Sequence, residues 1–332
     1  MAPEGPLRGP GGRPPTDRQS RIRGGKLVCI SSCAWLLAGA LVGTPSAHAA
    51  SASPQLCGRG TPLNAAQQDR LLRVADVVKR ELEASGASVA LVARSGLNLA
   101  RFGIRYSHAG VSLKASANAP WSVRQLYFAC DEGRPRLYDQ GLPGFLFGTD
   151  DPSLGYLSIV LLPRDAADAL ERAALDDARA LRLLSGTYSA NAHAWGLRYQ
   201  NCNQWVIEMI ASAWGAPGVA GSGADERAQA QHWLATQGYV PQPVQVGSHL
   251  WMLAANFIPW LHNDDHPQDD LFALRFRISL PTSIEAFVRT QVPGAERIEV
   301  CHDEHHAVLR RGWTPIGAGC RAEAGDRVIA LD

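Results

Sequence analysis

The order of apolar and polar residues predicts one long helix followed by several strands in the first half of the chain. In residues 64–85 the apolar side chains recur at intervals of three and four, the period of an amphipathic helix, and Asn64 suits its N-cap position. Short segments rich in β-branched and aromatic residues follow, together with one almost wholly apolar run. We therefore predict strands within residues 87–96, 105–114, 121–130 and 156–163.

Two further helices are predicted in the middle of the chain. Residues 165–184 carry interleaved acidic and basic residues, and residues 201–214 are mostly apolar. On the second helix a polar residue recurs at every fourth position, so this helix should be buried except for a narrow stripe that faces solvent. The stripe consists of Gln204, Glu208 and Ser212.

Turn-forming residues mark the connections. Residues 131–151 are rich in Gly, Pro and Asp, which indicates an ordered loop, and the Gly-rich residues 215–225 mark a break in the chain. Beyond this break the pattern predicts shorter elements. These are helices within 226–238, 248–261 and 281–290, and a pair of strands joined by a polar turn within 297–320.

The N-terminus has the features of a secretory signal peptide. Pro, Gly and Arg dominate up to Lys26, an apolar run covers residues 27–43, and Ala47-His48-Ala49 supplies a small-x-small cleavage pattern. A retained membrane anchor is the alternative, but the run is near the short limit of about 17 residues for spanning a bilayer. We expect cleavage after Ala49, a periplasmic or secreted protein, and a single mature domain at residues 50–332.

Charge narrows the expected partners. Loss of residues 1–49 removes six of the 32 basic and two of the 31 acidic side chains, which leaves a formal net charge of −3. This balance does not favour nucleic acid. No later run of about 18 uncharged apolar residues occurs, so we expect no membrane span in the mature chain. The expected partner is a cell-envelope substrate, and we expect a monomer without a cofactor.

The mature chain keeps five cysteines, and an odd number in an oxidising compartment leaves one thiol unpaired. Cys301 and Cys320 flank the predicted strand pair, so we expect them to form one disulfide. Cys57 would then pair with Cys130, which leaves Cys202 as the free thiol. The alternative is that several of these residues are simply buried free cysteines.

Cys202 stands where polar chain turns into the helix 201–214. The N-terminus of a helix and its free backbone N–H groups stabilise a thiolate and a developing oxyanion, so we expect a thiol pKa below about 8.5 and a nucleophilic role. His108, which small residues follow at Ala109 and Gly110, is the candidate base. The alternative for His108 is an ordinary hydrogen-bonded histidine.

A third polar residue should orient the imidazole. Gln125 stands among apolar residues on the strand after the histidine strand and is our candidate, although it could instead face outward. Asp131 and Asp139 are the substitutes. The backbone N–H of Cys202 is the expected oxyanion donor. Gln200 is a weaker candidate for that role. The residues expected to line the cleft around the thiol are Asn201, Tyr106, Trp195 and Tyr188.

The order of these motifs resembles that of a known group. A strand reading SHAGV, a polar residue on the next strand and a cysteine that opens a helix as NCNQWV resemble the circularly permuted papain-like thiol hydrolases, which are related to the NlpC-type cell-wall peptidases and lecithin:retinol acyltransferase. This resemblance covers residues 87–215. Together, YSHAGV, YDQGL, RYQNCNQWV and NDDHP also resemble a proteobacterial family known only as a domain of unknown function, over most of the mature chain.

The resemblance implies an α+β fold with a circularly permuted papain-like core, in which an antiparallel sheet packs on the central helix that carries the cysteine. The core would cover about residues 57–215, and residues 216–332 would form a helical and hairpin extension. The resemblance implies Cys202 as nucleophile, His108 as base and Gln125 at the third position. Related enzymes often have a histidine or an acidic residue there, and an amide stabilises an imidazolium less than a carboxylate does.

Two polar clusters suggest other chemistry. HNDDH at residues 262–266 and HDEHH at residues 302–306 contain enough imidazole and carboxylate for a divalent metal, but neither has the spacing of a defined site, so we predict no metal. We expect a peptidase- or amidase-like thiol hydrolase or acyltransferase that acts on an amide or ester in the cell envelope. The alternatives are a catalytically silent papain-like binding module and a metal-dependent hydrolase that uses HNDDH.

Overall fold

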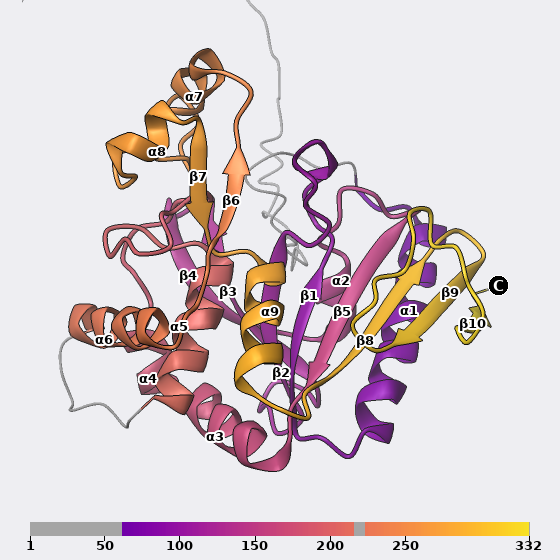
Figure 1. Cartoon of the computed structure of the whole chain (residues 1–332). Coiled ribbons are helices and arrows are strands. Elements are labelled where there is room, and N and C mark those ends of the chain that lie inside the picture. The colour runs from indigo at the N-terminus through magenta and orange to yellow at the C-terminus, as the bar shows by residue number, and fades with distance from the viewer. Residues whose placement is uncertain (1–61, 216–222, 332) are drawn as a thin grey trace, which may run out of the picture. The chain divides into compact units, whose positions relative to one another are not determined.

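The computed structural model describes residues 62–215 and 223–331. These residues form a mixed α+β fold around a large antiparallel sheet (Figure 1). The predicted signal segment, its cleavage point at Ala49, and Cys57 lie outside the described residues. Among the helices of the described part, none is long and apolar enough to cross a membrane.

In the described residues eight strands form the main sheet, in the spatial order β10-β9-β8-β5-β1-β2-β3-β4, and each neighbouring pair is antiparallel. All the strands predicted from the sequence are confirmed, and the C-terminal strands extend the sheet that the N-terminal strands begin. The bounds are β1 (Val89–Arg94), β2 (His108–Leu113), β3 (Ser122–Ala129), β4 (Arg134–Gln140), β5 (Gly155–Leu161), β8 (Glu296–His302), β9 (His306–Arg311) and β10 (Arg327–Ala330).

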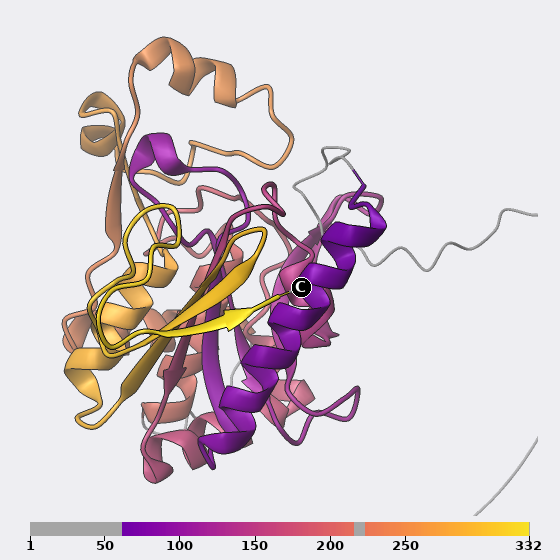
Figure 2. The same cartoon turned by 90° about the vertical axis from the view of Figure 1, so that its right-hand side faces the viewer.

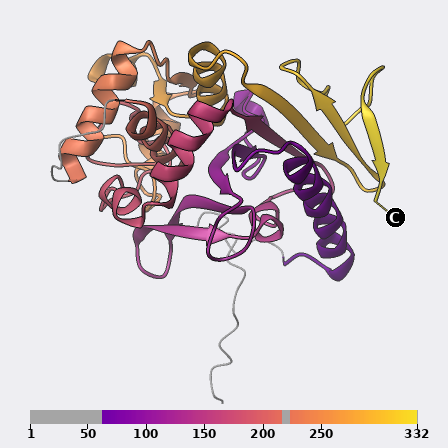
Figure 3. The ribbon, with the colours of Figure 1, turned by 90° about the horizontal axis from the view of Figure 1, so that it is seen from below.

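Helices pack on both faces of this sheet, because the central strands are apolar on both sides. Val89 and Val111 share one core with α3, α5 and α9, whereas Ala90 and Val92 share another with α1 and α2. Figure 2 shows the long helix α1 running along its face, and Figure 3 shows the same layers from below. The helix bounds are α1 (Ala65–Ala84), α2 (Leu142–Leu146), α3 (Arg164–Leu175), α4 (Asp177–Arg182), α5 (Cys202–Trp214), α6 (Gly223–Thr236) and α9 (Pro281–Gln291).

Two sequence-based predictions in the first half of the chain are corrected. Residues 131–151 are not a loop, because they contain β4, which pairs along its length with β3, and the short helix α2. Gly141 and Pro143 produced the turn-like pattern, but they begin α2. Residues 165–184 form two helices instead of one, because Asp176 has an extended backbone (φ −78°, ψ 97°) and caps α4.

The predicted solvent-facing stripe on α5 is wrong for two of its three residues, since only Ser212 is partly exposed. Gln204 and Glu208 are fully buried, because α6 and the chain before α5 cover them. The Glu208 carboxylate accepts hydrogen bonds from Arg227 at 2.8 and 3.0 Å, from Gln231 at 2.8 Å and from Gln200 at 2.6 Å. Glu208 is therefore polar because it belongs to a buried ion pair with Arg227. A polar residue on this helix did not indicate a solvent-exposed position.

A small outgrowth stands above the sheet at its β2–β3 side (Figure 1, orange). It consists of β6 (Gln242–Gln245), α7 (His249–Ala255), α8 (Gln268–Phe272) and β7 (Arg275–Ile278), and β6 pairs with β7. Its core includes Val244, Met252 and Phe276. Leu99, which directly precedes the 3-10 turn at Ala100–Phe102, packs against this core. The sequence predicted a helix near α7 but neither the strand pair nor α8.

Cys301 and Cys320 form the disulfide expected from the sequence, with Cα atoms 5.5 Å apart. The other expected pair includes Cys57, which is outside the described residues. The HDEHH cluster forms the turn between β8 and β9, where the Asp303 carboxylate accepts hydrogen bonds from the backbone N–H groups of His305 and His306, both at 2.8 Å. This cluster thus shapes a hairpin.

Candidate functional site

The start of α5 is fixed against the entry of β2. Asn201 is the N-cap, with an extended backbone (φ −102°, ψ 172°), and its Oδ1 accepts a hydrogen bond from the Gln204 N–H at 2.7 Å. Asn203 Nδ2 donates to the Ser107 carbonyl oxygen at 3.2 Å. The Cys202 Sγ lies 4.0 Å from that same oxygen. The thiol is therefore held beside the residue that precedes β2.

His108 opens β2 and lies opposite Arg94 of β1 in the sheet register. Its Nε2 lies 2.8 Å from Gln125 Oε1, and Gln125 Nε2 donates to Gln140 Oε1 at 2.9 Å. Because an amide oxygen can only accept, this arrangement places the ring proton on Nε2. The neutral ring then keeps its lone pair on Nδ1, which has no hydrogen-bond partner among the described residues.

Aromatic rings hold the imidazole in place. Tyr127 stacks on His108 with ring centroids 4.7 Å apart and an interplanar angle of 15°, and Phe145 lies 5.9 Å away. Both aromatic side chains are buried. Since the ring is packed by Tyr127 and tied through Nε2, its orientation is set before any ligand binds.

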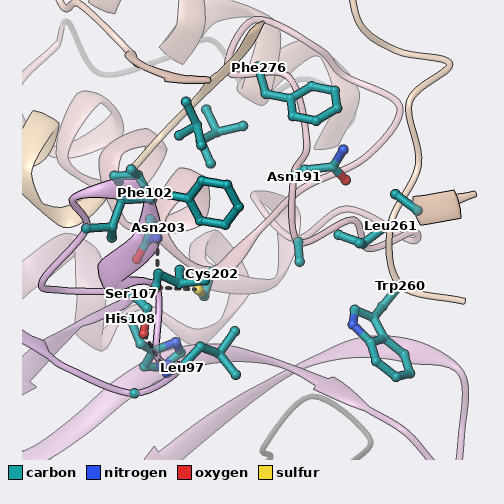
Figure 4. A pocket seen from close by; sticks show the side chains of 18 of the residues that line it. Leu97, Phe102, Ser107, His108, Asn191, Cys202, Asn203, Trp260, Leu261 and Phe276 are labelled. Atoms are coloured by element: carbon teal, nitrogen blue, oxygen red, sulfur yellow. Dashed lines mark hydrogen bonds between the residues drawn. The ribbon is translucent and has the colours of Figure 1, made fainter. Parts of the chain in front are cut away.

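Cys202 and His108 line one cavity of about 710 Å³, a volume typical of sites for small molecules. Figure 4 shows Cys202, Ser107 and His108 together at one wall and Asn191, Trp260 and Phe276 at the other. In the described structure, no hydrogen bond joins Sγ to either ring nitrogen of His108. The cavity is largely apolar, with walls that include Leu97, Phe102, Leu126, Trp260, Leu261 and Phe276.

Burial keeps both proposed catalytic groups neutral. Desolvation raises the pKa of the Cys202 thiol to about 12, and desolvation together with the charge of Arg94 lowers the pKa of His108 to about 3. The shift for Cys202 is opposite to the one we expected from its place at a helix N-terminus. The reason is that burial of the thiolate in this apolar cavity outweighs stabilisation by nearby N–H groups.

Backbone N–H groups nevertheless converge on the sulfur. Those of Asn203, Cys202 and Ala109 all lower the thiol pKa, against the larger effect of burial. Two of them come from the first turn of α5 and the third from β2. A negative charge that develops next to Sγ would therefore have preorganised donors from two elements.

Of the residues expected around the thiol, Tyr188 lines the cavity. The lining does not include the other four, Gln200, Asn201, Tyr106 and Trp195. The Gln200 side chain points into the buried Glu208 network, and Asn201 is used as the N-cap. The Tyr106 hydroxyl hydrogen-bonds to Glu299 and accepts from Arg297, and Trp195 packs edge-on to Tyr239 at 5.9 Å.

The two acidic substitutes for Gln125 are also placed elsewhere. Asp139 forms a two-pronged ion pair with Arg124, at 2.7 and 2.6 Å, and Asp131 is exposed in the turn after β3. Neither lines the cavity. Gln125 alone of the three candidates contacts the imidazole.

The sequence analysis missed residues that do line the cavity near the thiol. They include Asn203, whose Oδ1 is buried without a hydrogen-bond partner, as well as Arg94 and Tyr127. Arg94 ends an otherwise apolar buried strand, and that single charge was the available signal. Asn203 stands in the polar run that opens α5, and Tyr127 follows the pattern of an ordinary strand, so neither gave a comparable signal.

The HNDDH segment joins the outgrowth to the loop before α5. Asp265 accepts a hydrogen bond from the His193 backbone N–H at 2.9 Å, and a His266 ring nitrogen lies 2.7 Å from the Asn191 carbonyl oxygen. Asn263 Oδ1 accepts from the Asn191 side chain at 2.9 Å. No group of three or more potential metal ligands occurs in the part of the chain that the structure describes. The contacts of this segment thus fasten the outgrowth to the loop before α5.

Comparison with known families gives one match, to a family described as an uncharacterized protein conserved in bacteria, DUF2145. The match covers residues 81–288, more than half of the chain. The chain belongs to the DUF2145 family. No curated protein and no solved structure matches it. The DUF2145 region includes the whole of β2, β3 and α5 and therefore the Cys202, His108 and Gln125 side chains.

Proposed function

We propose that the protein is an exported cysteine-dependent hydrolase or acyltransferase that acts on an amide or ester in the cell envelope. Cys202 is the nucleophile, His108 the base and Gln125 the residue that orients the imidazole. One observation carries the proposal: a thiol at a helix N-terminus shares a cavity with a histidine whose Nε2 is held and whose Nδ1 can accept a proton. A circularly permuted papain-like core is part of this proposal.

The first step forms an acyl-enzyme. As Sγ attacks the substrate carbonyl carbon, His108 Nδ1 takes the thiol proton, and the carbonyl oxygen becomes an oxyanion near the backbone N–H groups of Cys202 and Ala109. Collapse of this intermediate breaks the bond to the nitrogen or oxygen of the leaving group. His108 gives its proton to that atom, and a thioester remains on Cys202.

The second step decides between hydrolysis and transfer. Water, or an alcohol or amine acceptor, attacks the thioester carbon and gives a proton to His108. The intermediate then releases the Cys202 sulfur, which regains the proton from His108. The product is a carboxylic acid with water and an acylated acceptor with an alcohol or amine, and the enzyme returns to its starting state in both cases.

The neutral resting state makes His108 a general base and not half of a preformed ion pair. With the thiol pKa at about 12 and the imidazole pKa at about 3, proton transfer has to accompany attack. A charged pair in this cavity would be costly because both groups are buried. Substrate dipoles and the converging N–H groups would have to stabilise the charge as it forms.

The apolar cavity favours a substrate with an acyl chain over a polar peptide. Its walls are largely apolar, and burial of each methylene of such a chain contributes about 0.8 kcal/mol. Trp251 of α7 lines the cavity and is 68% exposed, and the same segment also exposes Leu250 (75%) and Phe257 (84%). Acyl esters, amides and thioesters of the envelope fit this site.

Export completes the proposal. The support is the signal-like N-terminus with Ala47-His48-Ala49 and the disulfide between Cys301 and Cys320, which is typical of oxidising compartments. N-terminal sequencing of the native protein tests it. We expect a terminus near Ala50, and an intact Met1 on the native protein would contradict export.

A silent binding module is the second candidate, and the raised thiol pKa is the observation that favours it. The same cavity could hold an acyl chain without cleaving it. The two are separated by turnover of acyl esters with Cys202→Ala, Cys202→Ser and His108→Ala, and with His305→Ala as a matched control in an exposed turn. Loss of turnover in the first three variants alone supports the enzyme, and binding without turnover in the wild type supports the module.

A further inference from the structure

Arg94 is a buried cation without an anionic partner. Its side chain is 3% exposed at the end of β1 and lines the substrate cavity. In the described structure it forms no ion pair, and Asp150, which lines the same cavity, instead accepts a hydrogen bond from the Asn98 backbone N–H at 3.0 Å. A guanidinium cannot lose its charge by deprotonation, and a buried charge is costly unless it is paired.

The hydrogen bonds of Arg94 leave donors unused. Nη1 donates to the carbonyl oxygens of Gly148 and, at 3.4 Å, Ser95, and Nη2 donates to the Tyr127 hydroxyl at 3.2 Å. Nε is buried and has no partner. Of the five N–H donors of a guanidinium, three are engaged, and all three of their acceptors are neutral. The remaining donors and the whole charge are unmatched.

The surrounding chain keeps space for this group. A Cβ atom at Gly148 would lie 2.0 Å from Arg94 Nη2, and one at Gly96 would lie 2.5 Å from Nη1. Both glycines line the same cavity. A larger residue at either position would therefore have to displace the guanidinium.

Its charge acts on the proposed catalytic groups. Arg94 lowers the pKa of both His108 and Cys202, and Tyr127, which it hydrogen-bonds, stacks on the imidazole. An anion bound at Arg94 would therefore lie in the same cavity as Cys202 and His108, close enough for its charge to act on both.

We propose that Arg94 binds an anionic group of the substrate, a carboxylate or a phosphate, while the apolar walls hold its hydrocarbon part. This inference rests on the proposed function only in calling the ligand a substrate. A planar guanidinium binds both oxyanions through paired hydrogen bonds. The ligand expected to bind most tightly is thus an amphiphilic anion.

The test is a binding measurement on the Cys202→Ala protein, which has no nucleophile, so a failure of the proposed chemistry would not affect it. The probes are dodecanoate, dodecyl phosphate and the neutral dodecanol, below the concentrations at which they form micelles, with tryptophan fluorescence as the signal. We expect at least one anion to bind at least about tenfold more tightly than the alcohol. The preferred anion identifies carboxylate or phosphate as the group that is bound.

Variants assign the preference to Arg94. Arg94→Gln should remove it, whereas Arg101→Gln, which changes an exposed arginine of the same cavity, should leave it unchanged. If Arg94→Gln does not fold, Arg94→Lys replaces it and should lower the preference several-fold, because an ammonium lacks the planar fork. Equal binding of the anions and the alcohol by the Cys202→Ala protein would overturn the proposal. So would a preference for anions that persists after Arg94→Gln or that is lost after Arg101→Gln.

Discussion

Gln125 Oε1 lies 2.8 Å from His108 Nε2, in the interior of the sheet between β2 and β3. This contact determines which ring nitrogen carries the proton and leaves Nδ1 as the basic atom. Replacement of Gln125 by Ala should leave the fold intact and lower kcat/KM roughly tenfold, because the ring can then rotate and change tautomer. Gln125→Glu should instead raise the pKa of His108, since a carboxylate stabilises the imidazolium. A pH–rate profile of both variants checks the assignment, and unchanged profiles would exclude this role.

The raised thiol pKa makes a prediction about alkylation. Since the Cys202 pKa is about 12, the thiolate fraction and the rate of alkylation by iodoacetamide should rise about tenfold per pH unit from neutral pH upward, without a plateau below pH 10. Free cysteine, which has an ordinary pKa, is the control and should level off earlier. A plateau near neutral pH would mean that a thiolate is already formed in the resting protein.

The lowered pKa of His108 links stability to pH. The unfolded chain takes up this proton near pH 6.5 and the folded chain only near pH 3, so the unfolded state binds more protons between these values. The contribution is therefore fully present above pH 6.5 and is lost as the pH falls toward 3. Denaturant titrations across this window should show a weaker loss in His108→Gln than in the wild type. Equal pH slopes for the two proteins would contradict the shift.

The sequence revealed more of the fold's elements than of its site. Apolar periodicity located β1, β2, β3, β5 and α5, because these elements bury one or both faces. Cys202 was found as the odd thiol at a helix start, His108 from the small residues that follow it, and Gln125 as a polar residue among apolar ones. The cavity could not be predicted, because its walls combine β2 and β3 with the outgrowth that contains β6 and β7, far away in the sequence. Gln200 was expected at the cleft because it is polar and close to the thiol in sequence, but its side chain hydrogen-bonds to the buried Glu208.

Glu208 should be important for stability. It is fully buried and paired with Arg227, and Glu208→Gln would leave an unmatched charge on that arginine. Breaking a buried pair in this way typically costs about 3–5 kcal/mol of the free energy of unfolding. Glu83→Gln is the matched control, because Glu83 pairs with Lys79 at 3.8 Å on the solvent-facing side of α1 and its loss should cost less than about 1 kcal/mol. Chemical denaturation of both variants measures the difference, and similar losses would show that the buried pair has no special role.

The Cys301–Cys320 disulfide should stabilise the C-terminal strands. It closes a loop with a sequence separation of 19 that contains the β8–β9 turn and the whole of β9. In the chain-entropy model a loop of this size contributes about 3 kcal/mol. Cys301→Ser with Cys320→Ser should therefore lower the midpoint of denaturant unfolding without abolishing acyl-ester turnover, because both residues are outside the cavity. Loss of turnover in a folded double variant would connect this bridge to the site.

The most direct test of the nucleophile is to trap the acyl group. The protein is mixed with the p-nitrophenyl ester of dodecanoic acid, quenched in acid and digested, and the mass of the peptide that contains Cys202 is measured alongside p-nitrophenolate release. We expect a burst of p-nitrophenolate and an acyl thioester on Cys202, with a burst at least about a hundredfold slower in His108→Ala and absent in Cys202→Ala. An acyl group on another residue, or an equal burst in Cys202→Ala, would contradict the assignment of Cys202 as the nucleophile.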